Sequence, residues 1–315
     1  MRVLFIGLLV MGSLTGCLSS RPLSHSIAPN QVTTFYDYQL YTPTGEAVSL
    51  QTLPTELKQA DVILIGEWHT HPGIHRFQAE LLNQVSGAQR QVALSMEQFS
   101  RDTQTPLNHY LDNKIGEQFL KQQTRAWPNY ESDYRPLIEL AKHKQIPVIA
   151  SNAPKNIVRC IGREGIDYLN KLDEKERLWV ARTINTQSRP YKDKFMSSMH
   201  HGPTEQTERQ YAAQITWDET MAESITDYLS QFPGSQIIHI AGNFHIEQGH
   251  GIKQSILDRN PNLSVMIISP VKEIAAQSSD YLLHVLPIPT RYRLKTNQLA
   301  AFKQLSHRSN SLICK

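Results

Sequence analysis

The chain has 315 residues, 40% of them hydrophobic, and a formal net charge of +3. This length suits one large α/β domain or two small ones. The slight positive excess, with no basic stripe that carries interleaved aromatic residues, excludes a typical nucleic-acid-binding protein.

The N-terminus has the pattern of a bacterial export signal. A positively charged start is followed by an apolar run at residues 3–14, too short to span a membrane as a helix. The sequence Leu14-Thr-Gly-Cys17 then resembles the lipobox, which implies a signal peptide over residues 1–16, cleavage before Cys17, and acylation of that cysteine by diacylglycerol and a fatty acid such as palmitate. Several acyl chains give stable anchoring. An Asp directly after the cysteine would resemble an inner-membrane retention signal; Leu18 stands there instead, which favours the outer membrane. The alternative is a soluble exported protein.

The next residues predict a tether and a small hairpin. Residues 17–34 are polar and suit a lipid-anchored linker. Residues 36–50 predict two short strands around a Pro/Gly turn, and residues 52–59 predict a short helix. We expect an α/β domain over residues 35–290 and a polar C-terminal tail over residues 291–315.

The most informative stretch runs from Asp61 to His75. Val62–Ile65 predicts a strand buried on both faces, and Pro72 suits the first position of a helix that ends near Val85. Four polar residues lie where the strand gives way to the helix: Glu67, His69, His71 and His75. Ligands bind at this edge of open α/β sheets, so we expect at least two of the four to be functional. The alternative is that each is an ordinary capping residue.

Strands and helices alternate along the rest of the chain. The predicted strands are residues 92–96, 146–150, 236–241, 263–269 and 281–286, and the predicted helices between them are residues 105–116, 116–124, 137–141 and 252–257. This alternation predicts an α/β fold with a mostly parallel central sheet flanked by helices. Polar residues at the predicted strand ends should then share one crevice; they are Glu67, His69, Glu97, Asn152, Asn243 and His245.

Residues 155–230 contain no predicted strand. Helices are expected at residues 157–160, 165–172, 174–184 and 211–229. This helical insertion predicts a cap that closes a pocket over the sheet edge.

The cysteines exclude two redox motifs. The sequence has no Cys-x-x-Cys and no Cys-x-x-Cys-His, so it has neither a thioredoxin-like motif nor a c-type haem attachment site. Cys160 and Cys314 could pair in an oxidising compartment, and spacing alone leaves this open.

One chemistry that fits the strand-end residues is metal-dependent hydrolysis. Imidazole and carboxylate ligands suit zinc or manganese, and a bound metal would activate water. A protease or esterase of this kind would use Glu67, His69, Glu97 and His245. His245 and His250 do not have the spacing of the His-Glu-x-x-His motif.

The other chemistry is haem binding. Tyr and His are both suitable axial ligands for haem iron. The candidates are Tyr130, Tyr134, Tyr191, Tyr211, His200 and His201, with Met196, Met199, Met221, Trp127 and Trp217 as residues that could line an apolar slot. The alternative is that these Met and aromatic residues form an ordinary helical core.

A set of motifs in this order resembles the ChaN family of haem-binding lipoproteins, in the superfamily of Tiki, TraB/PrgY and erythromycin-esterase-like proteins. The motifs are Gly66–His69, Met96–Glu97, Tyr130 with Tyr134–Leu137, Pro147–Pro154, Ala213–Gln214 with Trp217–Ala222, and Gly242–His245. The resemblance covers most of residues 35–286 and adds weight to the haem interpretation.

The resemblance implies an iron-acquisition lipoprotein of the outer membrane, facing the periplasm, that forms a homodimer around two haems and works with haem-uptake transporter components. It implies a Tyr axial ligand, for which Tyr211 and Tyr134 lead, and a His near the propionates, for which His200 and His201 lead. The wider set expected to contact haem is His69, His71, Tyr130, Arg135 and His245. The hydrolase remains the enzyme alternative, and a purely structural envelope lipoprotein is the third.

Overall fold

The computed structural model describes residues 30–309 and 312–315, except residues 88–89, 188 and 200–203. One eight-stranded sheet has the order β2-β1-β8-β7-β3-β6-β4-β5. The strands are β1 (Gln39–Tyr41), β2 (Ala47–Val48), β3 (Val62–Glu67), β4 (Val92–Ser100), β5 (Val148–Asn152), β6 (Gln236–Gly242), β7 (Val265–Val271) and β8 (Tyr281–His284). The six strands from β8 to β5 are parallel, and β1 and β2 add an antiparallel edge. The predicted fold class is therefore confirmed.

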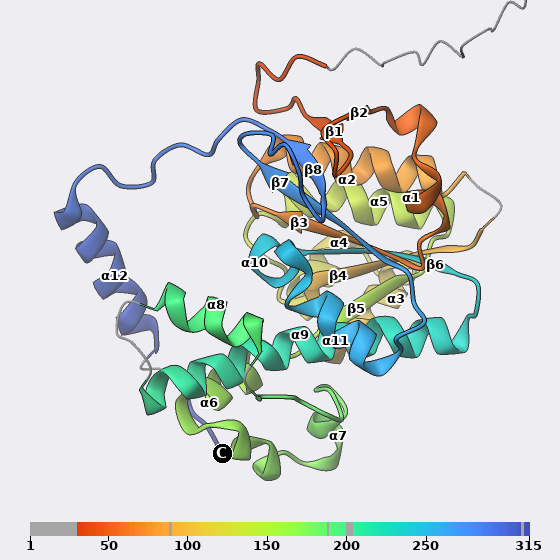
Figure 1. Cartoon of the computed structure of the whole chain (residues 1–315). Coiled ribbons are helices and arrows are strands. Elements are labelled where there is room, and N and C mark those ends of the chain that lie inside the picture. The colour runs from red at the N-terminus through yellow and green to blue at the C-terminus, as the bar shows by residue number, and fades with distance from the viewer. Residues whose placement is uncertain (1–29, 88–89, 188, 200–203, 310–311) are drawn as a thin grey trace, which may run out of the picture.

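Helices cover both faces of the sheet (Figure 1). They are α1 (Thr55–Gln59), α2 (Pro72–Val85), α3 (Gln104–Leu111), α4 (Glu117–Thr124), α5 (Arg135–Lys144), α6 (Lys155–Glu164), α7 (Glu174–Arg177), α8 (Pro190–Ser198), α9 (Glu205–Gln231), α10 (Asn243–Ile246), α11 (Ile252–Arg259) and α12 (Lys295–Ser309). Shorter turns are η1 (Leu50–Thr52), η2 (Arg101–Thr103), η3 (Tyr130–Tyr134), η4 (Ile166–Lys171) and η5 (Glu247–Gly249). Of the helices described, none is both long and apolar enough to cross a membrane.

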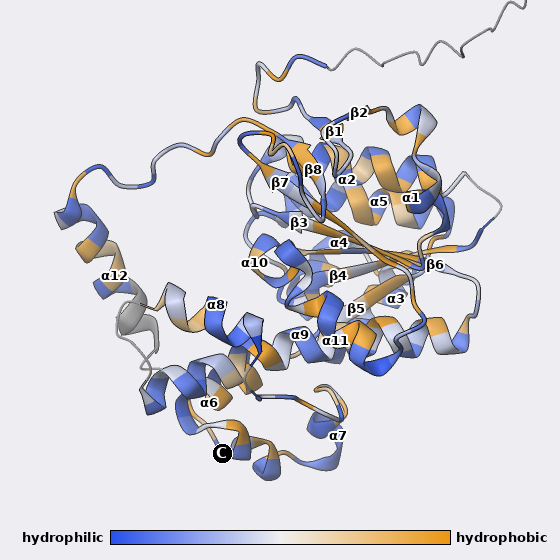
Figure 2. Cartoon of the chain, in the orientation of Figure 1, coloured by the Kyte–Doolittle hydropathy of each residue, from blue (hydrophilic) through white to orange (hydrophobic). Residues whose placement is uncertain are grey.

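Strand β3 shows why the chain folds this way. Its side chains alternate between the two faces of the sheet, so Ile63 and Ile65 pack with α2 and α5, whereas Val62 and Leu64 pack with α9 and α11. Both faces are buried, as expected for a central parallel strand. Figure 2 shows the matching hydrophobic stripe along the middle strands.

Several predicted boundaries differ from the structure; for example, the helix predicted over residues 105–116 ends at Leu111, and the helix predicted from Tyr211 begins at Glu205. Strand β4 continues through Glu97 to Ser100, because its pairing with β5 shifts register between Met96 and Ser100. The predicted helix over residues 174–184 ends at Arg177. After this end, the Arg177 guanidinium donates hydrogen bonds to the carbonyl oxygens of Val180 and Ala181. These side-chain bonds satisfy carbonyl groups that a continuing helix would pair with backbone amides. Helices α8 and α12 were not predicted.

A disulfide joins the C-terminal segment to the helical insertion. Cys160 of α6 is bonded to Cys314, with the two Cα atoms 5.7 Å apart. The Arg163 guanidinium also donates a hydrogen bond to the carbonyl of Leu312. The pairing that the sequence left open is therefore present, and the tail is part of the fold at its far end.

Candidate functional site

A cleft opens where the carboxyl ends of β3, β4, β5 and β6 meet. Its volume is about 970 Å³. Four of the six predicted strand-end residues line it: His69, Glu97, Asn152 and His245. Glu67 lies beneath His69, and Asn243 turns away to bond Glu247. The prediction of a shared crevice is thus correct for most of the set.

Glu67 is a buried carboxylate that holds His69 in place. His69 Nδ1 lies 2.9 Å from Glu67 Oε1, and Gln78, Gln98 and Tyr134 donate to the same carboxylate at 2.7–3.0 Å. Burial opposes the charge of Glu67, but the hydrogen bond from His69 and the charge of His75 outweigh it and lower its pKa. Burial also opposes the His69 cation, yet the carboxylates of Glu67 and Glu97 raise the pKa of His69.

A second imidazole–carboxylate pair lies across the cleft. His245 Nδ1 is 2.7 Å from Asp218 Oδ1, and both residues are buried. Burial disfavours the imidazolium, but Asp218 and then Glu97 more than offset it and raise the pKa of His245 to about 9. Glu97 lies between the two pairs, with Oε1 3.9 Å from His245 Nε2 and Oε2 accepting from the Gly242 amide at 2.7 Å.

Gly242 makes room for this arrangement. A Cβ atom at that position would lie 2.9 Å from His69 Cε1 and 3.0 Å from His69 Nε2. The φ of Gly242 is an ordinary −53°, so space rather than backbone conformation requires glycine here. Any side chain at this position would therefore force the His69 ring to shift.

The walls of the cleft are aromatic and partly cationic. Trp127 packs edge-on against His69, Trp217 packs against His245, and Trp179 completes the lining. Lys155, the first residue of α6, and Arg125 also line the cleft. Arg125 bonds Asp102, which partly neutralises it. A planar, apolar molecule with anionic groups suits such a cavity.

The two leading tyrosine candidates are buried in different places. Tyr134 lies behind His69, with its hydroxyl donating to Glu67. Tyr211 lies on α9 under Tyr191 and Phe195 of α8, and its hydroxyl has no hydrogen-bond partner among the described residues. Burial, reinforced by Glu67 for Tyr134 and by Asp218 for Tyr211, raises the pKa of both phenols.

The other predicted site residues do not gather in the cleft. Tyr130 is buried in the core, and Arg135 forms an ion pair with Glu117. His71 is buried at the start of α2 and bonds the carbonyl of Leu286. His200, His201 and Cys17 lie outside the described residues. Among the predicted haem-contacting residues that the structure describes, His69 and His245 line the cleft, and Tyr134 lies directly behind His69.

The predicted apolar slot is also divided. Met196 and Met199 pack with Tyr191, Phe195 and Tyr211 under α8. Met221 lies in the core beneath the sheet, whereas Trp127 and Trp217 line the cleft.

Several residues of the site received no site role from the sequence, although Gln214 and Asp218 lie within the family motifs. Asp218 and Gln214 come from α9, where Gln214 Nε2 lies 3.1 Å from His245 Nδ1. Gln78 comes from α2, and Trp179 follows α7. Asp218 could have been found from its place on the apolar face of a long helix. A carboxylate buried there needs a partner, and such a partner marks a candidate site.

The metal hypothesis finds little support in this geometry. Within the described part of the chain, no three His, Cys, Asp or Glu side chains are grouped closely enough to hold a metal ion. The cleft instead offers two imidazole–carboxylate pairs on either side of Glu97.

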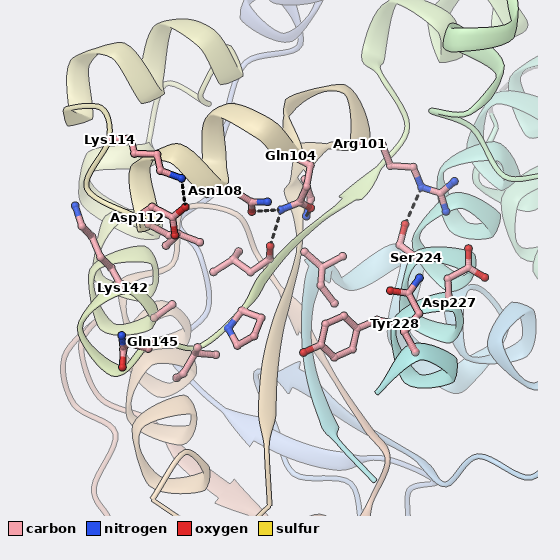
Figure 3. A pocket seen from close by; sticks show the side chains of 18 of the residues that line it. Arg101, Gln104, Asn108, Asp112, Lys114, Lys142, Gln145, Ser224, Asp227 and Tyr228 are labelled. Carbon is pink, nitrogen blue, oxygen red and sulfur yellow. Dashed lines mark hydrogen bonds and ion pairs between the residues drawn. The ribbon is translucent and has the colours of Figure 1, made fainter. Parts of the chain in front are cut away.

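A second cavity of about 950 Å³ follows the edge strand β5 (Figure 3). Its lining includes Gln104, whose amide donates to the Val148 carbonyl at 2.8 Å and accepts from the Ala150 amide at 2.7 Å. On the other wall, Arg101 reaches Ser224 of α9. None of the described residues that line this cavity is a histidine, so we place the candidate site in the cleft.

Comparisons with known proteins agree with this fold. A family model described as "Haem-binding uptake, Tiki superfamily, ChaN" matches residues 53–256. The solved structure "Cofacial heme binding to ChaN of Campylobacter jejuni" aligns with a TM-score of 0.62 and 18% identity, over 79% of this chain and 96% of that one. Protein RETICULATA-RELATED 5, chloroplastic, of Arabidopsis thaliana is 24% identical over 192 residues, which is 57% of this chain. The match spans only 26% of that plant protein.

Proposed function

Because this chain belongs to the ChaN family of haem-binding uptake proteins in the Tiki superfamily, we propose that it binds haem in the cleft at the carboxyl end of the sheet. The observation that carries the proposal is one cavity lined by three tryptophans and a histidine whose side chain is 45% exposed, His69. Aromatic walls suit a porphyrin, and an accessible imidazole suits its iron.

The contacts of His69 support a role as iron ligand. Glu67 is bonded to Nδ1, which leaves Nε2 for a ligand and raises the basicity of the ring. Lys155 and Arg125 are two of the cations lining the cleft that would pair with the haem propionates. Bound haem would supply the iron, and the protein would supply the ligand, the apolar walls and the counter-charges.

Tyr211 and Tyr134 remain the tyrosine alternatives. The Tyr211 hydroxyl lacks a partner among the described residues, and Met196 and Met199 lie nearby, so this cluster also fits an iron ligand with apolar surroundings. Because Tyr191 and Phe195 cover it, α8 would have to move first. Tyr134 would have to give up its hydrogen bond to Glu67.

We further propose that the protein is an acylated outer-membrane lipoprotein that serves iron acquisition as a haem-loaded homodimer. The lipobox at Cys17 supports the anchor. The Cys160–Cys314 disulfide supports export, because disulfides persist in oxidising compartments such as the periplasm. The ChaN structure of Campylobacter jejuni, named for cofacial haem binding, supports a paired haem arrangement.

A hemin titration of lipid-free protein tests the proposal. We expect a saturable ferric-haem spectrum and an increase in mass to a dimer on loading. His69→Ala should weaken hemin binding at least about tenfold and shift the spectrum, because the axial bond is lost. His109→Ala is the matched control, since His109 is an exposed histidine on α3 outside the cleft.

Tyr211→Phe and Tyr134→Phe complete the series. If either changes the spectrum while His69→Ala leaves it intact, the iron ligand is that tyrosine and our choice of His69 is wrong. If wild-type protein takes up no hemin saturably, the haem proposal itself fails.

Hydrolysis is the second candidate, favoured by the pairing of His69 with Glu67 and of His245 with Asp218 around Glu97. Such pairs can exchange protons with a substrate in the cleft. Failure of hemin uptake together with cleavage of a nitrophenyl ester, or with zinc or manganese retained after purification, would favour this candidate.

A further inference from the structure

The C-terminal segment, residues 281–315, has a distinctive composition. It carries six Lys or Arg residues and no Asp or Glu. The basic residues are Arg291, Arg293, Lys295, Lys303, Arg308 and Lys315. Because the chain as a whole is only slightly basic at +3, this segment concentrates positive charge in one place.

The same segment carries most of the exposed apolar side chains. Eleven large hydrophobic residues are exposed among those described, and six of them lie between residues 288 and 313. Phe302 is 69% exposed, Leu294 is 61% exposed, and Leu299 is 52% exposed. Leu299 and Phe302 are three residues apart in α12, so they share one face of the helix.

Helix α12 stands apart from the α/β body (Figure 1), and Figure 2 shows hydrophobic patches interrupting its hydrophilic turns. Both ends of the segment are nevertheless fixed. At one end β8 pairs with β1 and β7, and at the other Cys314 is bonded to Cys160. The fold thus holds a basic helix at the surface with the side chains of Leu299 and Phe302 exposed.

We propose that α12 and the preceding residues 288–294 dock on an anionic phospholipid surface. Leu299, Phe302 and Leu294 would enter the acyl boundary, while Arg291, Arg293 and Lys295 would contact the lipid phosphates. Charge complementarity favours a bilayer over a protein surface as the binding partner. The segment has basic but no acidic residues, so an anionic bilayer would attract it without local repulsion. The inference does not depend on haem binding.

Vesicle co-sedimentation tests the proposal with the chain from Leu18 onward, which retains every described residue and lacks the cysteine proposed to carry lipid. We expect binding to phosphatidylglycerol vesicles, little binding to pure phosphatidylcholine vesicles, and weaker binding as salt is raised. Arg291→Gln with Arg293→Gln should reduce the affinity roughly 25-fold, since each cation near an anionic surface contributes about fivefold.

Phe302→Ser should reduce the affinity at least about tenfold through lost apolar burial. The matched controls are Phe119→Ser, at a phenylalanine of α4 that is 50% exposed, and Lys58→Gln with Lys114→Gln. These controls should bind vesicles like the unaltered chain, and a normal unfolding transition shows that each variant folds.

Two results would overturn the proposal. One is equal binding to phosphatidylglycerol and phosphatidylcholine vesicles, or no binding to either. The other is a dimer in sedimentation velocity without lipid that dissociates with Phe302→Ser, which would identify a second copy of the chain as the occupant of this face.

Discussion

The pair formed by His245 and Asp218 shows how a single carboxylate sets the charge state of the cleft. Burial by itself would keep the imidazole neutral, yet Asp218 holds it protonated to a pH of about 9. Glu97 and Lys194 act on it in opposite directions. His239, earlier in β6, bonds the Ser95 hydroxyl instead of a carboxylate, and burial lowers its pKa to about 3. Contact with Asp218 therefore decides whether a buried imidazole in this region carries a proton.

This pair should make stability depend on pH. His245 keeps its proton to about pH 9 in the folded chain but loses it near 6.5 when unfolded. Its contribution is therefore complete below pH 6.5 and is lost as the pH rises to 9, a fall of about 3 kcal/mol in the free energy of unfolding. Asp218→Asn should remove this dependence and lower the pKa of His245, measured by denaturant unfolding and by NMR titration.

Asp227→Asn is the control, because Asp227 lies on the same helix but pairs with Arg182 at the surface. An unchanged His245 titration in Asp218→Asn would show that another group sustains the charge.

Among the secondary-structure elements, the edge strand β5 has an unusual protection. The side chain of Gln104 makes the two hydrogen bonds that a neighbouring strand would make, to the Val148 carbonyl and the Ala150 amide. Open strand edges invite pairing with other chains, and a side-chain amide in this position blocks it.

Gln104→Ala should therefore leave both backbone groups unpaired. We expect the free energy of unfolding to fall by about 1–2 kcal/mol and self-association to increase, measured by denaturant unfolding and light scattering. Gln118→Ala, at an exposed glutamine on α4, should change neither property. A fully monomeric Gln104→Ala variant would mean that the flanking helices alone protect the edge.

The elements that could be predicted from sequence were those with a strong local pattern. Strands β3 and β6 are apolar runs followed by Gly and polar residues, so their parallel ends, and with them His69 and His245, could be placed together in advance. The partners from helices could not, because helix periodicity does not say which turn of α9 meets β6. Hence Asp218 received no role in the site, and α12 was not predicted; its described apolar residues Leu299 and Phe302 are exposed.

At the scale of the whole molecule, the disulfide closes a loop over 154 residues that contains most of the helical insertion and the three strands β6, β7 and β8. Crosslinks that close long loops stabilise mainly by restricting the unfolded chain. The ion pair of Lys315 with Glu176 adds a further contact at the same end.

Reduction, or Cys314→Ser, should lower the free energy of unfolding by about 2–5 kcal/mol. The double variant Cys160→Ser with Cys314→Ser should lose little more free energy of unfolding than Cys314→Ser alone, because each variant lacks the same single disulfide. The measurement is denaturant unfolding with and without reductant. Additive losses would show that the two cysteines stabilise the fold separately, through packing.

The order of the strands also bears on how the chain reaches its native state. Val62 of β3 pairs with Ile237 and Val265, so the centre of the sheet cannot close until the last third of the chain is available. Such non-local pairing makes for slow folding, during which apolar strands stay exposed to aggregation. A polypeptide of this topology therefore stays unfolded until its final strands are available, a delay that would suit threading through a pore if the chain is exported as proposed.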